Sequence, residues 1–319
     1  MVASSGRVLV TGGAGLIGSH LCERLLAAGN DVWCVDNFST GADRNMQRMR
    51  EHSKFRVLPR DICDPFADDM PAIDAIFNLA CPAAPVHQKF DPVRVLKTTI
   101  NGAINVLELA RRNNARVLQA STSEIYGDPA VQPQPEAYWG YVNPIGPRSC
   151  YDEGKRAAEA MFFAYHRQYQ TRIKVARIFN TYGPRLHASD GRVVSTFIMQ
   201  ALDGRPITIF GTGDQARSYT YVDDTVEGLL LLMASAEDFQ GPVNIGNPDE
   251  STLLELAKTV VELTGSRSEI QFLPAVAEDP KQRQADISLA RKVLGWQPRT
   301  ALREGLARTI EYFRTIRQS

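Results

Sequence analysis

Short apolar runs alternate with amphipathic stretches through the first half of the chain. The runs are rich in Val, Ile, Leu and Phe, have the length of buried strands, and lie at residues 7–11, 31–36, 55–58, 73–80, 115–120 and 173–178. The longest helical pattern covers 91–112, and we expect its apolar stripe at Leu96, Ile100, Ile104, Leu107 and Ala110. Strands that alternate with helices in this way predict an α/β fold with a Rossmann-type doubly wound parallel sheet.

The alternation weakens after residue 183. Helical patterns follow at 195–202, 225–233, 253–263 and 302–313, and short strand patterns at 207–210 and 243–245. We therefore expect a Rossmann domain over 1–183, to which segments around 218–247 return. A smaller α+β C-terminal domain is expected over 184–319.

The balance of charged residues and the spacing of the cysteines argue against several classes of protein. The chain has 36 Lys and Arg residues against 36 Asp and Glu residues, which argues against nucleic-acid binding through a general basic field. Five scattered cysteines without CxxC spacing and five separated histidines predict no disulfide framework and no metal site. No apolar run approaches the roughly 18 residues of a membrane span, and a strand is expected to begin too early for a signal peptide to precede it. We expect a soluble, cytoplasmic protein that binds neither nucleic acid nor membrane.

A glycine-rich turn joins the first predicted strand to the first predicted helix. Its sequence is Gly12-Gly-Ala-Gly-Leu-Ile-Gly18, which allows a tight turn and a close approach of the backbone to a diphosphate at the start of a helix. Asp36 ends the next strand, 18 residues after Gly18, where a carboxylate can accept hydrogen bonds from an adenosine ribose and repel a 2′-phosphate. The turn therefore predicts a dinucleotide site that prefers NAD to NADP.

Tyr151 and Lys155 are four residues apart, so on a helix they share one face. A Lys ammonium at that spacing would favour the phenolate, and we expect it to lower the pKa of Tyr151 enough for general-base work near neutral pH. Ser123 and Glu124 follow the strand at 115–120, so their side chains should reach the same edge of the sheet. Beside a dinucleotide site, these four side chains predict a redox active site.

Five longer strings resemble one enzyme family. They are Ser121-Thr-Ser-Glu-Ile-Tyr-Gly-Asp-Pro129, Tyr138-Trp-Gly-Tyr-Val-Asn-Pro-Ile-Gly-Pro147, Cys150-Tyr-Asp-Glu-Gly-Lys-Arg156, Ala176-Arg-Ile-Phe-Asn-Thr-Tyr-Gly-Pro-Arg185 and Asp190-Gly-Arg-Val-Val-Ser195. From Val8 to about Phe313 the chain resembles the extended short-chain dehydrogenase/reductases that act on nucleotide sugars. Within that family it most resembles the UDP-glucuronic acid decarboxylases, also called UDP-xylose synthases.

The resemblance implies a reaction and its catalytic residues. By position, those residues are Thr122, Ser123, Glu124, Tyr151, Lys155 and Arg283. Tyr151, assisted by Lys155, would take the proton of the sugar 4-hydroxyl while hydride passes from C4 to a tightly bound NAD⁺. The resulting β-keto acid would lose CO₂, and protonation at C5 with return of the hydride would give UDP-xylose.

The implied roles of the other four residues follow from the same resemblance. Thr122 and Ser123 resemble the hydroxyls near the 4-oxygen and the carboxylate. Glu124 resembles the acid/base carboxylate, and Arg283 the arginine that assists decarboxylation or protonation.

The resemblance also implies binding residues and an assembly. We expect NAD contacts from Gly12, Gly15, Leu16, Ile17, Gly18, Asp36, Asn37, Ser39, Gly41, Asp61, Ile62, Leu79, Lys97, Tyr151 and Lys155. Asp61 and Ile62 are expected at the adenine end because they follow the strand pattern at 55–58. We expect UDP-sugar contacts from Gln88, Asn180, Arg192, Val194, Gly211, Arg217 and Tyr219. A homodimer is implied, in which the helices over 91–112 and 151–169 of two copies form a four-helix bundle.

Two stretches depart from the family pattern. Gln88 stands where the family usually has a Tyr near the sugar and its carboxylate. Around Arg283, the string Gln282-Arg-Gln-Ala285 replaces a more usual basic residue and proline. From these departures we expect some UDP-4-keto-pentose to be released alongside UDP-xylose.

Other interpretations stay open at this point. A nucleotide-sugar 4-epimerase, including one for UDP-glucuronic acid, and a 4,6-dehydratase share the oxidation at C4. A dehydratase is expected to carry Asp before Glu124, where this chain has Ser123, and an epimerase would leave Glu124 and Arg283 without a role. A catalytically silent NAD-binding protein on the same fold is disfavoured by the intact Tyr151 and Lys155.

Overall fold

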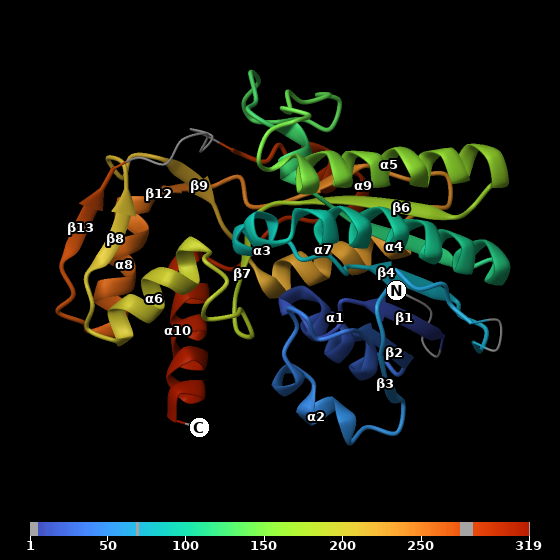
Figure 1. Cartoon of the computed structure of the whole chain (residues 1–319), viewed down its shortest axis with the longest axis horizontal. Helices are drawn as coiled ribbons and strands as arrows, with labels where there is room; N and C mark the ends of the chain where they lie inside the picture. Colours follow the sequence, from blue (N-terminus) through green and yellow to red (C-terminus); the bar gives the residue numbers. More distant parts are fainter. Residues whose placement is uncertain (1–5, 68–69, 275–282, 319) are drawn as a thin grey trace.

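A seven-stranded parallel sheet forms the larger part of the structure (Figure 1). The computed structural model describes residues 6–67, 70–274 and 283–318. The strand order is β11-β6-β5-β4-β1-β2-β3, and every neighbouring pair is parallel. The strands are β1 (Arg7–Thr11), β2 (Asp31–Asp36), β3 (Phe55–Pro59), β4 (Ala75–Asn78), β5 (Arg116–Thr122), β6 (Ile173–Ile178) and β11 (Val243–Ile245). The order reverses between β1 and β4, as in a doubly wound fold, and this confirms the predicted fold class.

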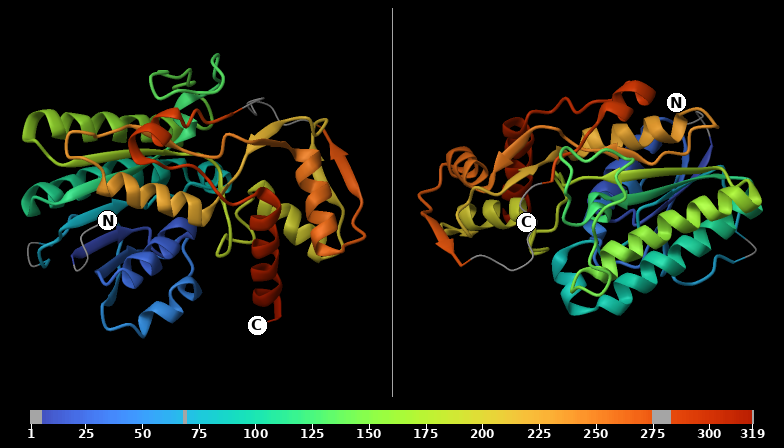
Figure 2. Two further views of the ribbon diagram at one scale, coloured as in Figure 1. Left: turned by 180° about the vertical axis from the view of Figure 1, so that it is seen from behind. Right: turned by 90° about the horizontal axis from the view of Figure 1, so that it is seen from above.

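Helices cover both faces of this sheet. On one face α4 and α5 pack against each other, and on the other α1 and α7 lie together (Figures 1 and 2). The helices around the sheet are α1 (Leu16–Ala27), α2 (Gln47–Arg50), α3 (Pro85–Phe90), α4 (Pro92–Asn113), α5 (Ser149–Tyr169), α7 (Val222–Ala234) and α9 (Ser288–Leu294), with 3₁₀ turns η1 (Asp43–Asn45) and η2 (Ser123–Tyr126).

Side chains along β1 alternate between two hydrophobic clusters. Val8 and Val10 pack in the cluster that contains Leu21 of α1, whereas Leu9 packs with Val106 of α4. Because both faces are buried, the strands have continuous apolar runs instead of alternating apolar and polar residues.

The remaining elements form a second lobe beside the sheet (Figure 1). Its helices and strands are α6 (Val193–Leu202), α8 (Leu253–Thr264), α10 (Leu302–Gln318), β8 (Ile207–Phe210), β9 (Ala216–Ser218), β12 (Glu250–Thr252) and β13 (Ile270–Leu273). The strands pair as parallel β8–β13 and antiparallel β9–β12. At the junction with the sheet, β7 (Thr181–Tyr182) pairs in parallel with β10 (Thr220–Tyr221).

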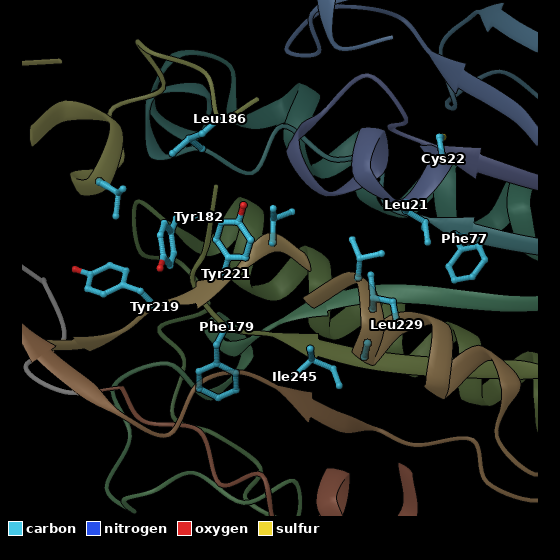
Figure 3. Packing of buried hydrophobic residues seen from close by; sticks show 14 of the residues in the cluster. Leu21, Cys22, Phe77, Phe179, Tyr182, Leu186, Tyr219, Tyr221, Leu229 and Ile245 are labelled. Carbon is cyan, nitrogen blue, oxygen red and sulfur yellow. The ribbon is translucent and has the colours of Figure 1, made fainter. Parts of the chain in front are cut away.

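Aromatic side chains pack where the lobe meets the sheet. The ring of Tyr182 stands edge-on to Tyr221 and Tyr219, with centroids 5.8 Å and 6.4 Å apart (Figure 3). These rings belong to the same buried cluster as Leu21 and Leu229 of the sheet-covering helices. A continuous core therefore holds the second lobe against the carboxyl edge of the sheet.

The predicted helix over 91–112 is confirmed as α4, which begins one residue later, at Pro92. A separate short helix, α3, precedes it, and Asp91 caps α4 by accepting a hydrogen bond from the N–H of Arg94 at 3.0 Å. Pro92 follows at the first helical position, which suits its fixed φ and missing donor.

The predicted apolar stripe of this helix is partly wrong. Leu96 and Ile104 are each 37% exposed, whereas the buried apolar residues are Val95, Ala103, Val106, Leu107, Leu109 and Ala110. The helix turns its small residues inward, and a Cβ on Gly102 would lie only 3.1 Å from Ile62. Gly102 therefore lies on the buried face and allows α4 to pack closely against Ile62. No helix in the described ranges has both the length and the apolar character needed to span a membrane.

Candidate active site

A cavity of about 760 Å³ opens at the carboxyl edge of the sheet, between the strand ends and the second lobe. This is the place where doubly wound folds bind ligands. The predicted residues that line it are Gly12, Gly15, Leu16, Ile17, Gly18, Asp36, Asn37, Ser39, Gly41, Ile62, Leu79, Gln88, Thr122, Ser123, Glu124, Tyr151, Lys155, Asn180, Arg192, Val194, Arg217, Tyr219 and Arg283. Residues from many separate segments of the chain thus converge on one cavity.

Three predicted contacts lie away from this lining. Asp61 accepts hydrogen bonds from the Asn37 amide at 2.9 Å and from Arg94 at 3.1 Å. Lys97 lies on an exposed face of α4, and Gly211 donates its N–H to the carbonyl of Leu273 at the end of the β8–β13 pair. The structure therefore does not bring these three residues to the cavity surface.

The glycine turn at the start of the cavity is held by close backbone contacts. Gly12 has a φ of +68°, and a Cβ there would stand 2.8 Å from the Ala80 nitrogen. A Cβ on Gly18 would lie 2.1 Å from the Gly12 carbonyl oxygen. Helix α1 starts after Gly15, which has no side chain to cap the first N–H groups. This uncapped helix start suits the diphosphate of a dinucleotide.

Asp36 organises the ribose end of the same turn. Its carboxylate accepts hydrogen bonds from the Ala14 N–H at 2.9 Å and the Phe38 N–H at 2.8 Å. Burial raises the pKa of Asp36, and the two backbone donors oppose this rise. A carboxylate has about four acceptor sites, so Asp36 keeps acceptor capacity for ribose hydroxyls. The glycine turn and Asp36 together fit NAD.

Tyr151 and Lys155 lie in the cavity on one face of α5, but their electrostatics differ from the expectation. Burial raises the pKa of Tyr151, and negative charge at the nearby Cys81 sulfur would raise it further. A hydrogen bond with Thr122 lowers the pKa and so opposes these two effects. The Lys155 ammonium donates to the Ala120 carbonyl at 2.8 Å and lies 5.8 Å from the Tyr151 ring centroid. The predicted lowering of the pKa is therefore wrong for the protein alone, because desolvation outweighs the distant ammonium.

Glu124 is held between two arginines. Its Oε1 accepts from Nη1 of Arg283, and its Oε2 lies 2.8 Å from Nη2 of Arg148. Burial disfavours the charge of Glu124, but the guanidinium groups of Arg283 and Arg148 outweigh burial and lower its pKa. Glu124 is therefore ionised at neutral pH. The structure joins two residues that the sequence separates by 159 positions, and it adds Arg148, which the sequence analysis missed.

A paired segment positions Arg283. Gln134, which is fully buried, donates its N–H to the Gln284 carbonyl at 3.0 Å and accepts the Asp286 N–H at 3.2 Å. Its side-chain oxygen also accepts the Gln284 N–H at 3.0 Å. The long loop before α5 thereby fixes the backbone next to Arg283. Gln282, which belongs to the second departure from the family pattern, lies outside the described residues.

The sugar end of the cavity contains Gln88 and several basic side chains. Gln88 is buried in α3 and donates from Nε2 to the Ala83 carbonyl at 3.1 Å. Arg192 lies 3.4 Å from Asp190, and Arg217 donates to the Ala216 carbonyl. Other basic lining residues that the sequence analysis did not assign are Arg44, Arg60, His87, Arg148, Arg185 and His187. Cationic groups at both ends of the cavity suit a ligand with several negative charges.

Comparisons with known proteins identify a matching family model and similar sequences. Residues 8–246 match the model of the NAD dependent epimerase/dehydratase family. The chain is 52% identical over 312 residues to UDP-glucuronic acid decarboxylase 6 of Arabidopsis thaliana, covering 98% of this chain and 90% of the relative. It is 51% identical over 307 residues to UDP-glucuronic acid decarboxylase 1 of Danio rerio, covering 96% and 72%.

Solved structures show the same fold. The crystal structure of UDP-glucuronic acid 4-epimerase from Bacillus cereus, in complex with UDP-glucuronic acid and NAD, superposes with a TM-score of 0.86 at 29% identity. It covers 97% of this chain and 99% of that one. The UDP-glucose 4-epimerase of Thermotoga maritima, with UDP-glucose, has a TM-score of 0.88 at 32% identity over 97% and 99%.

Proposed function

This chain belongs to the NAD dependent epimerase/dehydratase family, and from that premise we propose that it decarboxylates UDP-glucuronic acid to UDP-xylose through a 4-keto intermediate. The observation that carries the proposal is the pairing of Glu124 with Arg283 beside Tyr151 and Thr122 in one cavity. An arginine near the sugar can bind the sugar carboxylate, and the carboxylate of Glu124 can act as an acid or base in the reaction there. The identity of about half the residues with UDP-glucuronic acid decarboxylases supports the same substrate.

NAD⁺, bound along the glycine turn and Asp36, would supply the oxidant for C4 and later the reductant for the ketone. The phenol oxygen of Tyr151 is then the group that takes and returns the 4-hydroxyl proton, and Thr122 orients it through their hydrogen bond. Arg283 would hold the carboxylate of the sugar in the orientation from which CO₂ leaves. Ser123 and Lys155 line the same part of the cavity and complete the proposed catalytic set.

A 4-epimerase is the second candidate, because solved epimerases share the fold at TM-scores of 0.86 and 0.88. An epimerase fits less well, because inversion at C4 requires no catalytic role of the Glu124–Arg283 pair. The identities with those epimerases, 29% and 32%, are also far below those with the decarboxylases.

We propose that release of some UDP-4-keto-pentose accompanies UDP-xylose formation. The buried Gln88 amide is engaged with the Ala83 carbonyl. Gln88 therefore gives the keto sugar a weaker anchor than a phenol at this position would.

The remaining parts of the assignment are also proposals. Residues 1–183, with returning segments near 218–247, form the NAD-binding unit, and 184–319 form the nucleotide-sugar unit. Two copies would pair through α4 and α5, where Leu96 and Ile104 leave apolar surface exposed. A cytoplasmic location is proposed because the five cysteines are scattered and lack CxxC spacing, as is typical of proteins that keep their thiols reduced.

The test is a time course of the purified protein with UDP-glucuronic acid and NAD⁺, followed by proton NMR. Loss of the carboxylated sugar with appearance of a UDP-pentose is expected. Appearance of UDP-galacturonic acid without release of CO₂ would replace the decarboxylase by the epimerase. The ratio of UDP-xylose to hydrated ketone measures how much keto sugar escapes.

A further inference from the structure

Asn244 is a buried asparagine that joins three separate segments of the chain. It lies in the middle of β11, is fully buried, and does not itself line the cavity. Its Nδ2 donates to the carbonyls of Gln134 at 2.9 Å and Asp286 at 3.0 Å, and its Oδ1 accepts from the Tyr126 hydroxyl at 2.7 Å. Both donors and the acceptor of the amide therefore have partners.

The partners determine which way the Asn244 amide points. The carbonyls of Gln134 and Asp286 can only accept hydrogen bonds, so the amide nitrogen must face them. Burial raises the pKa of Tyr126 to about 12, so its phenol keeps the proton that it donates to the amide oxygen. An alanine at this position would remove a hydrogen-bond partner from all three groups.

Tyr126 connects Asn244 to the turn that carries Glu124. Tyr126 and Glu124 both belong to η2, in which Glu124 lines the cavity and Tyr126 is fully buried. The Tyr126 hydroxyl also accepts from Nη1 of Arg177 at 3.1 Å. Asn244 therefore holds the buried end of this short turn, two residues away from the Glu124 carboxylate.

The Nδ2 atom of Asn244 holds the segment that carries Arg283. Alternate side chains of this segment are buried, at positions 283, 285 and 287, as in an extended strand. One Nδ2 bond goes to the Asp286 carbonyl, three residues after Arg283, and the other goes to Gln134, whose main chain pairs with the same segment. The position of Arg283 therefore depends on Asn244 through two contacts.

We propose that Asn244 is a positioning residue for the decarboxylation step, because one amide holds both the η2 turn of Glu124 and the segment of Arg283. This inference rests on the proposed function. The ion pair between Glu124 and Arg283 fixes these two side chains relative to each other. Asn244 fixes the pair relative to the sheet, and hence relative to a sugar bound beside Tyr151.

The effect of Asn244 should fall on one chemical step. Tyr151 and Lys155, which are proposed for oxidation at C4, lie on α5, whereas the hydrogen bonds of the Asn244 side chain go to other segments. Oxidation should therefore continue when Asn244 is changed, and loss of CO₂ from the resulting β-keto acid should slow. The 4-keto uronic acid then accumulates on the protein.

Rapid mixing of the Asn244→Ala variant with UDP-glucuronic acid and NAD⁺ tests this. The absorbance of reduced nicotinamide reports oxidation at C4, and labelled CO₂ from carboxyl-labelled substrate reports decarboxylation. Oxidation should stay within about twofold of the unmodified rate, whereas release of CO₂ should slow about tenfold to a hundredfold, as expected for a displacement of about 1 Å near the reacting group. Reduced nicotinamide should therefore accumulate in the variant.

Asn244→Asp is the conservative variant for rescue. Its carboxyl group would face two carbonyls in a buried position, which favours the protonated form and leaves one donor and one acceptor. It should therefore recover part of the rate of CO₂ release that Asn244→Ala loses. If Asn244→Ala folds poorly, Asn244→Asp in the same assay should still show a smaller slowing that is confined to CO₂ release.

Calorimetry without NAD⁺ gives a readout that does not depend on turnover. Asn244→Ala should weaken the binding of UDP-glucuronic acid several-fold, because a displaced Arg283 holds the sugar carboxylate less well. Binding of UDP-xylose, which has no carboxylate, should change by less than about twofold.

Asn30→Ala is the matched control. Asn30 is also fully buried, and its Nδ2 donates to the Leu25 carbonyl at 3.0 Å, beyond the end of α1 that lies away from the glycine turn. This change should lower the free energy of unfolding and leave both steps and both affinities unchanged.

The outcomes separate the two proposals. The role of Asn244 is overturned if Asn244→Ala leaves CO₂ release unchanged, slows it no more than oxidation, or weakens UDP-glucuronic acid and UDP-xylose equally, while decarboxylation by the unmodified protein stands. Failure of the unmodified protein to release CO₂ from UDP-glucuronic acid overturns both proposals.

Discussion

A buried ion pair behind the active site should control the stability of the fold. Arg177 on β6 and Glu159 on α5 are 9% and 8% exposed, and they make two parallel contacts of 3.0 Å and 2.8 Å. The Arg177→Met variant removes the guanidinium but leaves the Glu159 carboxylate buried. Its remaining described donor is the Ser121 hydroxyl at 2.5 Å.

The size of the effect follows from these contacts. Breaking one partner of a buried ion pair costs about 3–5 kcal/mol, because the remaining charge is uncompensated. Arg177 also donates to the Tyr126 hydroxyl at 3.1 Å and the Glu136 carbonyl at 2.8 Å, which places the variant toward the upper end of that range. Replacing both partners, as in Arg177→Met with Glu159→Leu, removes the unpaired charge and should recover most of the loss.

Urea unfolding of the three proteins, followed by far-ultraviolet circular dichroism at one protein concentration, measures the free energy of unfolding. Arg303→Met, at an exposed ion pair with Glu262, is the matched control and should leave the midpoint unchanged. The reasoning is refuted if Arg177→Met costs less than about 1 kcal/mol, or if the double variant is less stable than Arg177→Met alone.

Three further predictions concern the site. Gly18→Ala should abolish NAD binding in a fluorescence titration, because its Cβ would lie 2.1 Å from the Gly12 oxygen; normal affinity would contradict this geometry. Gln88→Tyr should lower the ratio of released ketone to UDP-xylose in the NMR assay, and an unchanged ratio would remove Gln88 from the explanation of keto-sugar release. Burial first and the Glu124 charge second raise the pKa of Asp152 to about 7, so the contribution of Asp152 to the free energy of unfolding should fall as pH rises from about 4 to about 7. Asp152→Asn stays neutral, so it should unfold at higher urea than wild type at pH 8 by a margin that vanishes below about pH 4, and a margin independent of pH would exclude ionisation of Asp152 as its cause.

The parallel sheet could be predicted because its strands are apolar on both faces. Predicted runs such as 173–178 and 243–245 coincide with β6 and β11. Two-residue strands such as β7 and β10 were not predicted, because pairs of residues such as Thr181–Tyr182 are too short to show a period. The buried face of α4 was partly misjudged because it is set by contacts with distant segments, such as that between Gly102 and Ile62, 40 positions earlier, which the helical pattern alone does not show.

The residues that line the cavity were easier to predict from the sequence than their ion pairs and pKa shifts. Strand ends deliver Gly12 and Ser123 to one edge of the sheet, so the motif positions indicate which residues meet. Arg148 escaped notice because its partner, Glu124, is 24 residues away and no local pattern marks an ion pair of that kind. Of the three predicted contacts outside the cavity, Asp61 was expected from its place after the strand pattern at 55–58, and Lys97 and Gly211 from the family resemblance. Neither source describes the local packing of this chain.

The pKa of Tyr151 shows why spacing alone is insufficient. An i, i+4 pair shares a helix face in every fold, but the direction of a pKa shift depends on what surrounds the hydroxyl and where the ammonium donates. Here Lys155 donates to the carbonyl of Ala120, at the end of β5, and the phenol is desolvated in the cavity. The Tyr151 oxygen can therefore take a proton near neutral pH only if a positive charge comes closer to it. Lys155 and Arg192 both line the cavity and can supply this positive charge. The charge of Arg192 already opposes part of the rise in the Tyr151 pKa. The proposed general-base role of Tyr151 therefore depends on positive charge near the phenol when ligands occupy the site, and not on the YxxxK spacing by itself.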